Sequence, residues 1–78
     1  MENGVRADAT GVNALLDYIR DRHDIRSDAE LARELGCRPP VISKMRHGWL
    51  SFGAAYILAI HEVFDMPIKE IKERLRAS

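Results

Sequence analysis

Three basic side chains, Arg38, Lys44 and Arg46, lie in a span, residues 35–61, that contains no Asp or Glu. The whole chain has zero net charge and 31% charged residues, so an acid-free span of this length is unusual. Guanidinium and ammonium groups bind phosphate oxygens, and lysine also donates to O6 and N7 of guanine. Because salt screens charges beyond roughly 8–10 Å, a local basic face can attract phosphates on a neutral protein. The span therefore predicts a nucleic-acid-binding face with modest non-specific affinity.

The residues that usually carry catalysis or bind metal ions are few and scattered. Cys37 is the only cysteine, and the histidines, His23, His47 and His61, show no short metal-ligand spacing. The five glycines are dispersed and form no phosphate-binding loop. We therefore expect no enzymatic activity, no metal site and no cofactor.

Length and composition limit the class of protein further. A chain of 78 residues forms one small domain, with little room for an enclosed active site beside a core. No apolar run approaches the roughly 18–20 residues of a membrane span, and Glu2 and Asp8 argue against a signal peptide. The single cysteine cannot form a disulfide within the chain. These features predict a cytoplasmic protein with no membrane partner.

The spacing of apolar residues predicts an all-α fold of five short helices. The first helix should have Thr10 or Asn13 as its cap and end near residues 23–24. Ser51 should cap the fourth helix, and Pro67 should start the fifth. The apolar positions expected on these three helices are Val12, Leu15, Leu16, Ile19, Phe52, Ala55, Ile57, Leu58, Ile60, Phe64, Ile68, Ile71 and Leu75.

The segment 27–47 divides into two further helices joined by a tight turn. Ser27 and Glu30 fit a capping box, in which each side chain satisfies a free backbone N–H of the other residue. Gly36 should end the second helix. The third should start at Pro39–Pro40, where a missing N–H costs little, and run to the end of the segment. Two short helices with a tight turn between them are the layout of a helix-turn-helix.

Several short elements follow one another in a characteristic order. They are Ala29-Glu30-Leu31-Ala32, Leu35-Gly36, Pro40-Val41-Ile42-Ser43-Lys44, Arg46-His47-Gly48, and Leu58-Ala59-Ile60 followed by Phe64 and Pro67. In this order and spacing they resemble the Cro/repressor-like, or lambda-repressor-like, helix-turn-helix domains of bacteria and phages. The resemblance implies a compact five-helix bundle over residues 10–76, after a flexible segment at residues 1–9. It also implies a sequence-specific transcriptional regulator that binds double-stranded DNA, usually as a homodimer, and is associated with the nucleoid.

The resemblance also implies roles for individual residues. It places Ile42 and Met45 inward, and Gly36 in a turn that requires positive φ. The free N–H groups of the helix that begins near Ser27 would form a phosphate site. The residues expected at the DNA are Ser27, Arg38, Pro39, Pro40, Ser43, Lys44, Arg46 and His47.

Within this set the expected contacts differ in kind. Ser43, Lys44 and His47 are the candidates to reach base edges or phosphates. Arg38 and Arg46 should bind the flanking phosphates, which orients a protein on DNA without reading its sequence.

Two positions depart from the family pattern. Glutamine is frequent where this chain has Asp28, and also at the start of the third helix, where this chain has Pro39–Pro40. Prolines can contact a thymine methyl but cannot donate a hydrogen bond. A carboxylate repels phosphate unless it pairs with Arg38 or accepts from cytosine N4. The alternative function is a protein-docking or dimerisation module of the same fold, of the anti-repressor, antitoxin or phage accessory type.

Two further features allow more than one interpretation. Trp49 either covers the edge of the core or stacks against the DNA backbone, and packing is favoured. Ile68, Ile71 and Leu75 are either core residues or an exposed stripe that forms a dimer.

Overall fold

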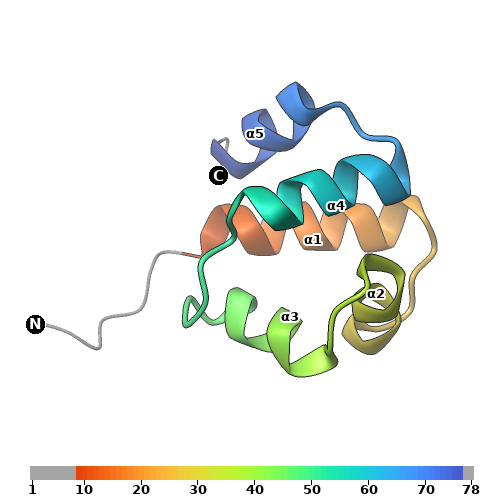
Figure 1. Ribbon diagram of the computed structural model, residues 1–78, viewed down its shortest axis with the longest axis vertical. Helices are drawn as coiled ribbons and strands as arrows, with labels where there is room; N and C mark the ends of the chain where they lie inside the picture. The colour runs from red at the N-terminus through yellow and green to blue at the C-terminus, as the bar shows by residue number, and fades with distance from the viewer. Residues whose placement is uncertain (1–8, 77–78) are drawn as a thin grey trace, which may run out of the picture.

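The computed structural model describes residues 9–76 and contains five α-helices and no strand within them (Figure 1). The helices are α1 (Thr10–Arg22), α2 (Asp28–Leu35), α3 (Pro39–Arg46), α4 (Ala54–Phe64) and α5 (Ile68–Arg76). The predicted all-α class is confirmed. Most of the predicted flexible lead, residues 1–8, lies outside the described residues. None of the five helices has the length and apolar character needed to cross a membrane.

The core forms where the apolar sides of all five helices meet. α1 packs mainly against α5, and α2 packs mainly against α3. The buried hydrophobic residues are Leu15, Leu16, Ile19, Ile25, Leu31, Ala32, Ile42, Met45, Ile60, Met66 and Ile71. No polar or charged residue is buried among the described residues. The core is therefore stabilised by burial of apolar area, and any polar chemistry lies at its surface.

The C-terminal apolar positions belong mostly to the core. Ile71 is buried, and Leu75 is half-buried against the core. The α1 and α5 backbones approach so closely that a Cβ on Gly11 would lie 2.0 Å from the carbonyl oxygen of Leu75. Only Ile68 of the predicted stripe is exposed. The stripe is therefore not a free surface for dimer formation.

α1 begins differently from the prediction. Its N-cap residue is Ala9, with no side-chain cap, so neither Thr10 nor Asn13 caps the helix. Asn13 is instead directed across the molecule, because its amide nitrogen donates to the carbonyl oxygens of Ala9 at 3.0 Å and of Arg46 at 2.7 Å. The second of these bonds ties α1 to the end of α3.

The start of α2 shows the predicted cap with one change. Ser27 Oγ accepts from the backbone N–H of Glu30 at 3.1 Å. The Glu30 carboxylate accepts from the N–H of Arg26 at 3.1 Å rather than from Ser27, so the return bond falls one residue earlier than a capping box requires. The first bond satisfies a donor that the helix itself leaves free, and the second holds the residue before the cap.

The turn between α2 and α3 has the predicted glycine geometry. Gly36 adopts φ 76°, in the left-handed region that glycine enters at little cost. The N–H of Cys37 then donates to Ala32 O at 2.9 Å, which closes the end of α2 as in a Schellman motif. Pro39 and Pro40 occupy the first two positions of α3, as predicted.

α4 starts later than the sequence suggested. Its N-cap is Gly53, not Ser51, and Phe52 lies in the preceding loop, half-buried against the core. Neither Gly53 nor any acid in the first turn caps the helix. α5 follows Pro67 as predicted.

Candidate nucleic-acid interface

One side of α3 is exposed along the whole helix. At 3.6 residues per turn, the side that carries Ile42 and Met45 points into the core, where they are 0% and 1% exposed. The predicted inward positions are therefore confirmed. The opposite side, which we call the outer face of α3, consists of Pro39, Pro40, Ser43, Lys44 and His47, all exposed. All five were predicted at the DNA, and the fold brings them together.

Two more predicted residues flank the outer face of α3. Ser27 is the N-cap of α2 and Arg38 is the N-cap of α3, and both are exposed. The backbone N–H groups of the first turn of α2 carry a partial positive charge there. Ser27 Oγ is already used by Glu30, so the site near Ser27 would bind an anion through backbone groups.

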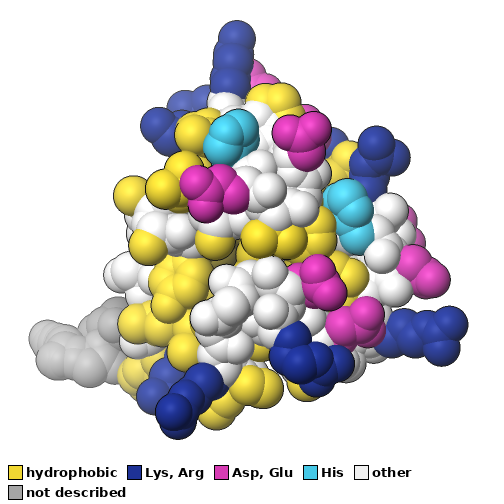
Figure 2. Space-filling view, turned by 45° about the vertical axis from the view of Figure 1, so that its right-hand side comes forward, with side chains coloured by type: hydrophobic (Ala, Val, Ile, Leu, Met, Phe, Trp, Pro, Cys, Tyr) yellow, Lys and Arg dark blue, Asp and Glu magenta, His cyan; other side chains and the backbone are white. Residues whose placement is uncertain are grey.

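The charge around the outer face of α3 is positive. Arg38 and Lys44 form no ion pair with any residue between 9 and 76, and α3 has no acid in its first turn. Figure 2 shows Lys and Arg side chains along the lower edge of the molecule, the side on which Figure 1 places α2 and α3, with Asp and Glu side chains just above them. These two cations are therefore available to an external anion.

His47 is oriented by a local hydrogen bond. Its Nδ1 lies 2.8 Å from the carbonyl oxygen of Ser43. A carbonyl oxygen only accepts, so Nδ1 carries the proton. Nε2 is then the outward nitrogen, and it accepts a hydrogen bond when the ring is neutral.

Arg46 is placed differently from the other predicted contacts. Its side chain is only 15% exposed and lies between α1, α2 and α3. Its Nε and Nη2 donate to the two carboxylate oxygens of Asp28 at 2.7 and 3.0 Å. Nη2 also lies 2.9 Å from Asp17 Oδ1, and Nη1 donates to Asn13 Oδ1 at 2.7 Å. We call this group of residues the Arg46 network. The guanidinium is thus directed at groups of the protein and not outward beside Arg38, where a phosphate contact was predicted.

The Arg46 network keeps the guanidinium charged. Burial alone would lower the pKa of Arg46, but the hydrogen bonds and charges of Asp28 and Asp17 outweigh it and raise the pKa above its ordinary value. A two-pronged pair of this kind also fixes direction, because both nitrogens must face both oxygens. The network therefore sets the orientation of α3 against α1 and α2.

Asp28 is neutralised by the same contacts. The predicted partner for this carboxylate was Arg38, but the structure pairs it with Arg46 and with Arg20, whose Nη1 lies 3.1 Å from Asp28 Oδ1. Two guanidinium groups on one carboxylate remove most of its repulsion for a phosphate near α2. The structure thus explains how a carboxylate is accommodated at this position.

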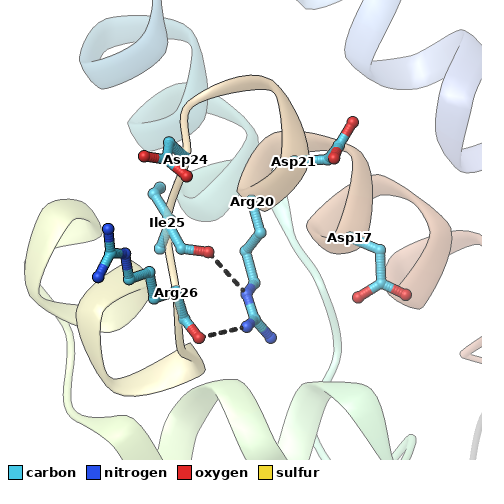
Figure 3. A pocket seen from close by; sticks show the side chains of 6 residues that line it. All are labelled: Asp17, Arg20, Asp21, Asp24, Ile25 and Arg26. Carbon is cyan, nitrogen blue, oxygen red and sulfur yellow. Dashed lines mark hydrogen bonds between the residues drawn. The ribbon is translucent and has the colours of Figure 1, made fainter.

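A hollow of about 520 Å³ lies on the other side of Arg20, between the end of α1 and the loop to α2 (Figure 3). Arg20 closes one wall, because its Nε donates to Ile25 O at 3.3 Å and its Nη2 to Arg26 O at 2.8 Å. The lining residues are Asp17, Arg20, Asp21, Asp24, Ile25 and Arg26. Three carboxylates against two guanidinium groups give the hollow a net negative charge, which disfavours an anionic ligand there.

The described residues do not bring together groups for metal binding or for nucleophilic catalysis. No cluster of three or more His, Cys, Asp or Glu side chains that could hold a metal ion occurs within residues 9–76. Burial raises the pKa of the Cys37 thiol, which disfavours the nucleophilic thiolate. Trp49, in the loop after α3, does not cover the core as favoured above, because it is 61% exposed.

The partners of Arg46 could not be recognised in the sequence. Asp28 and Asn13 lie 18 and 33 positions away from it along the chain, so no local spacing connects them. The only signal in the sequence is indirect: two acids and an amide, Asp17, Asp28 and Asn13, precede a helix that has cations and no acid.

Comparisons of the chain with protein-family models, curated proteins and solved structures gave no match. The function is therefore argued from the geometry above.

Proposed function

We propose that α2, the turn at Gly36 and α3 form a helix-turn-helix, and that the protein is a small sequence-specific DNA-binding regulator of transcription. α3 is the recognition helix and enters the major groove. The observation that carries this proposal is the outer face of α3, where five exposed residues without an acid lie opposite Ile42 and Met45. A recognition helix needs one side packed in the core and a polar, acid-free side that is free to contact DNA, and α3 has both.

The roles within the interface follow from the chemistry and position of each side chain. Lys44 and Ser43 contact base edges, because a lysine donates to guanine and a serine can donate or accept. His47 offers an outward Nε2. Arg38 and the backbone N–H groups after Ser27 bind phosphates on the two sides of the groove.

Arg46 acts within the protein in this proposal. The Arg46 network holds α3 at one angle, so that the outer face of α3 keeps a fixed position relative to the N-terminus of α2. A dimer would place two such units on half-sites about one helical turn, roughly 34–36 Å, apart. A regulator of this kind acts in the cytoplasm at the nucleoid and needs neither catalysis nor a cofactor.

The salt dependence of DNA binding tests the proposal. Trp49 is the only tryptophan and lies three residues after the end of α3, so its fluorescence reports on a ligand there. Titration with a mixed-sequence duplex at several salt concentrations should give a log–log slope of several units, because each neutralised phosphate contributes about −0.9. A slope near zero with no fluorescence change at low salt would contradict DNA binding.

The second candidate function is protein docking without DNA. The observation that favours it is the set of exposed large apolar side chains on α4, where Leu58 and Val63 are 47% and 44% exposed. A docking module would bind through this region and leave the outer face of α3 unused. The salt slope separates the two functions, because burial of apolar surface releases almost no counterions.

A further inference from the structure

The exposed large hydrophobic residues are confined to one part of the described chain. They are Trp49, Leu50, Leu58, Val63 and Ile68, whereas α1, α2 and α3 have none. Leu58 is the largest side chain on the outward side of α4, which also carries Ala54, Ala55 and Glu62, all exposed. At 3.6 residues per turn, Leu58 and these three residues form one continuous stripe. We call it the α4 stripe.

The start of α4 presents the backbone N–H groups of Ala54 and Ala55 beside the α4 stripe, whereas the N–H of Tyr56 donates to the carbonyl oxygen of Gly53 at 3.1 Å. Gly53 provides no side-chain cap, and the first turn contains no acid. The first N–H groups of a helix have no partner within it and carry a partial positive charge. Ala54 and Ala55 leave this end accessible, because their side chains end at Cβ. Glu62, two turns further on, is the acid on the same stripe.

From this arrangement we propose that two copies of the chain associate through their α4 stripes, with the two helices antiparallel about a two-fold axis beside Leu58. Leu58 then packs against Leu58 of the other copy. Glu62 lies four residues after Leu58 and Ala54 four residues before it, so Glu62 of each copy meets the N-terminus of α4 in the other. An isologous contact repeats this match twice. The carboxylate supplies the missing cap, and the alanines let it approach.

The two-fold axis also suits the proposed DNA face. In Figure 1, α4 is drawn in front of α1, with α5 above it and with α2 and α3 below it. The two-fold axis lies in the contact plane and is perpendicular to α4, so it runs from top to bottom in this view. Rotation about a vertical axis leaves the lower side of the molecule at the bottom, and both copies of α3 therefore lie on the same side. Two recognition helices on one side are what a palindromic operator requires. This consequence rests on the proposed function, but the contact between the α4 stripes does not.

The size of the α4 stripe sets the strength of the contact. A helix of 11 residues is about 16 Å long. A stable interface buries roughly 800 Å² per partner, which is more than one short helix supplies. The dimer is therefore weak and dissociates on dilution, and simultaneous binding of two half-sites would stabilise it.

Sedimentation of the full chain without DNA tests the contact across a range of concentrations. The wild type should shift with concentration from the 8.9 kDa monomer toward twice that mass. Leu58→Glu should raise the dissociation constant at least about tenfold, because it places two charges against each other at the axis. The matched control is Val63→Glu, on the same helix and similarly exposed but turned by about 140°. It should change the constant less than about threefold.

A cross-link tests the register. In a Cys37→Ser background, Leu58→Cys should form a disulfide-linked dimer under mild oxidation, because the two sulfurs face each other at the axis. Lys72→Cys, exposed on α5, should not. A wild type that stays monomeric at millimolar concentration, or equal effects of the two Glu variants, would overturn the proposal. Since no DNA is present, such a failure leaves the salt-dependent DNA titration untouched, and the two proposals fail separately.

Discussion

α3 and α4 are both short helices with one exposed side, but the two sides differ in chemistry. The outer face of α3 holds prolines, Ser43, Lys44 and His47, and the α4 stripe holds alanines, Leu58 and one acid. A polar cationic side keeps its water until phosphates or base edges replace it, whereas an apolar side gains from contact with another apolar side. One small domain therefore presents two surfaces of different chemistry.

The inner attachments of the two helices differ as well. α4 is held by apolar contacts such as that of Ile60, which is 0% exposed. α3 has apolar contacts too, but it is also fixed by the directional bonds of Arg46 to Asp28 and Asn13. Apolar packing tolerates small rotations, whereas a two-pronged ion pair does not. A helix that reads base edges requires such a fixed angle.

The largest effect should come from removing the polar attachment of α3. Arg46→Ala should lower the free energy of unfolding by about 2 kcal/mol, because the hydrogen bonds of the guanidinium to Asn13 and Asp28 are lost, although Asp28 keeps Arg20 and Asp17 is largely exposed. Urea denaturation measures this loss. Lys44→Ala, exposed on the same helix, should change the free energy by less than about 0.5 kcal/mol. Equal losses from the two variants would show that the network does not fix α3.

The DNA affinity of the same two variants sharpens the contrast between the two sides of α3. Arg46→Ala should weaken binding through misplacement of α3 and leave the salt slope unchanged. Lys44→Ala should reduce the affinity for specific DNA about tenfold or more, which corresponds to a loss of about 1–3 kcal/mol of binding free energy. The control is Lys72→Ala on α5, which should be nearly neutral. Similar losses from Lys44→Ala and Lys72→Ala would remove α3 from the interface, and a slope that falls by about 0.9 in Arg46→Ala would make Arg46 a phosphate contact.

The cap of α2 gives a smaller effect. Ser27→Ala should cost about 1 kcal/mol of stability, because the N–H of Glu30 loses its acceptor. Thermal unfolding followed by circular dichroism measures this loss, with Ser43→Ala as the exposed control. An unchanged midpoint would show that the bond contributes nothing in solution.

The smallest expected effect concerns the uncapped start of α4. Gly53 has extended backbone with φ −91°, and a Cβ there would meet no atom within 4 Å. Gly53→Ser should therefore stabilise the monomer by about 0.5 kcal/mol, since it adds a cap and restricts the unfolded chain. It should also weaken the contact between the α4 stripes, because the N–H groups no longer need Glu62 of the other copy. A destabilised monomer would contradict the account of this helix end.

Much of the fold could be predicted because its signals are local. The apolar spacing of α1, the cap at Ser27 and the positive φ at Gly36 each depend on a few neighbouring residues. The start of α4 differs from the prediction because Ser51 and Gly53 are both acceptable caps, and Phe52, which lies between them, packs against the core from the loop. The chain itself could not show that Asp28 belongs to Arg46, because only the fold brings them together.

The candidate site, like the fold, could be predicted only where its signals are local. The outer face of α3 follows from helical spacing once Ile42 is placed inward. The role of Arg46 does not, because an arginine at a helix end looks the same in sequence whether it faces solvent or a carboxylate. The exposure of Trp49 likewise depends on where the loop after α3 runs.

Binding of DNA to the outer face of α3 can be followed residue by residue in an NMR titration of the backbone amides, with a mixed-sequence duplex added at low and at moderate salt. DNA binding by the outer face of α3 predicts shifts concentrated at Ser27–Asp28 and residues 38–49 that shrink as salt rises. The amides of α5 should stay in place. No shifts at low salt, or shifts confined to α4 and α5, would contradict the claim and assign the protein to docking.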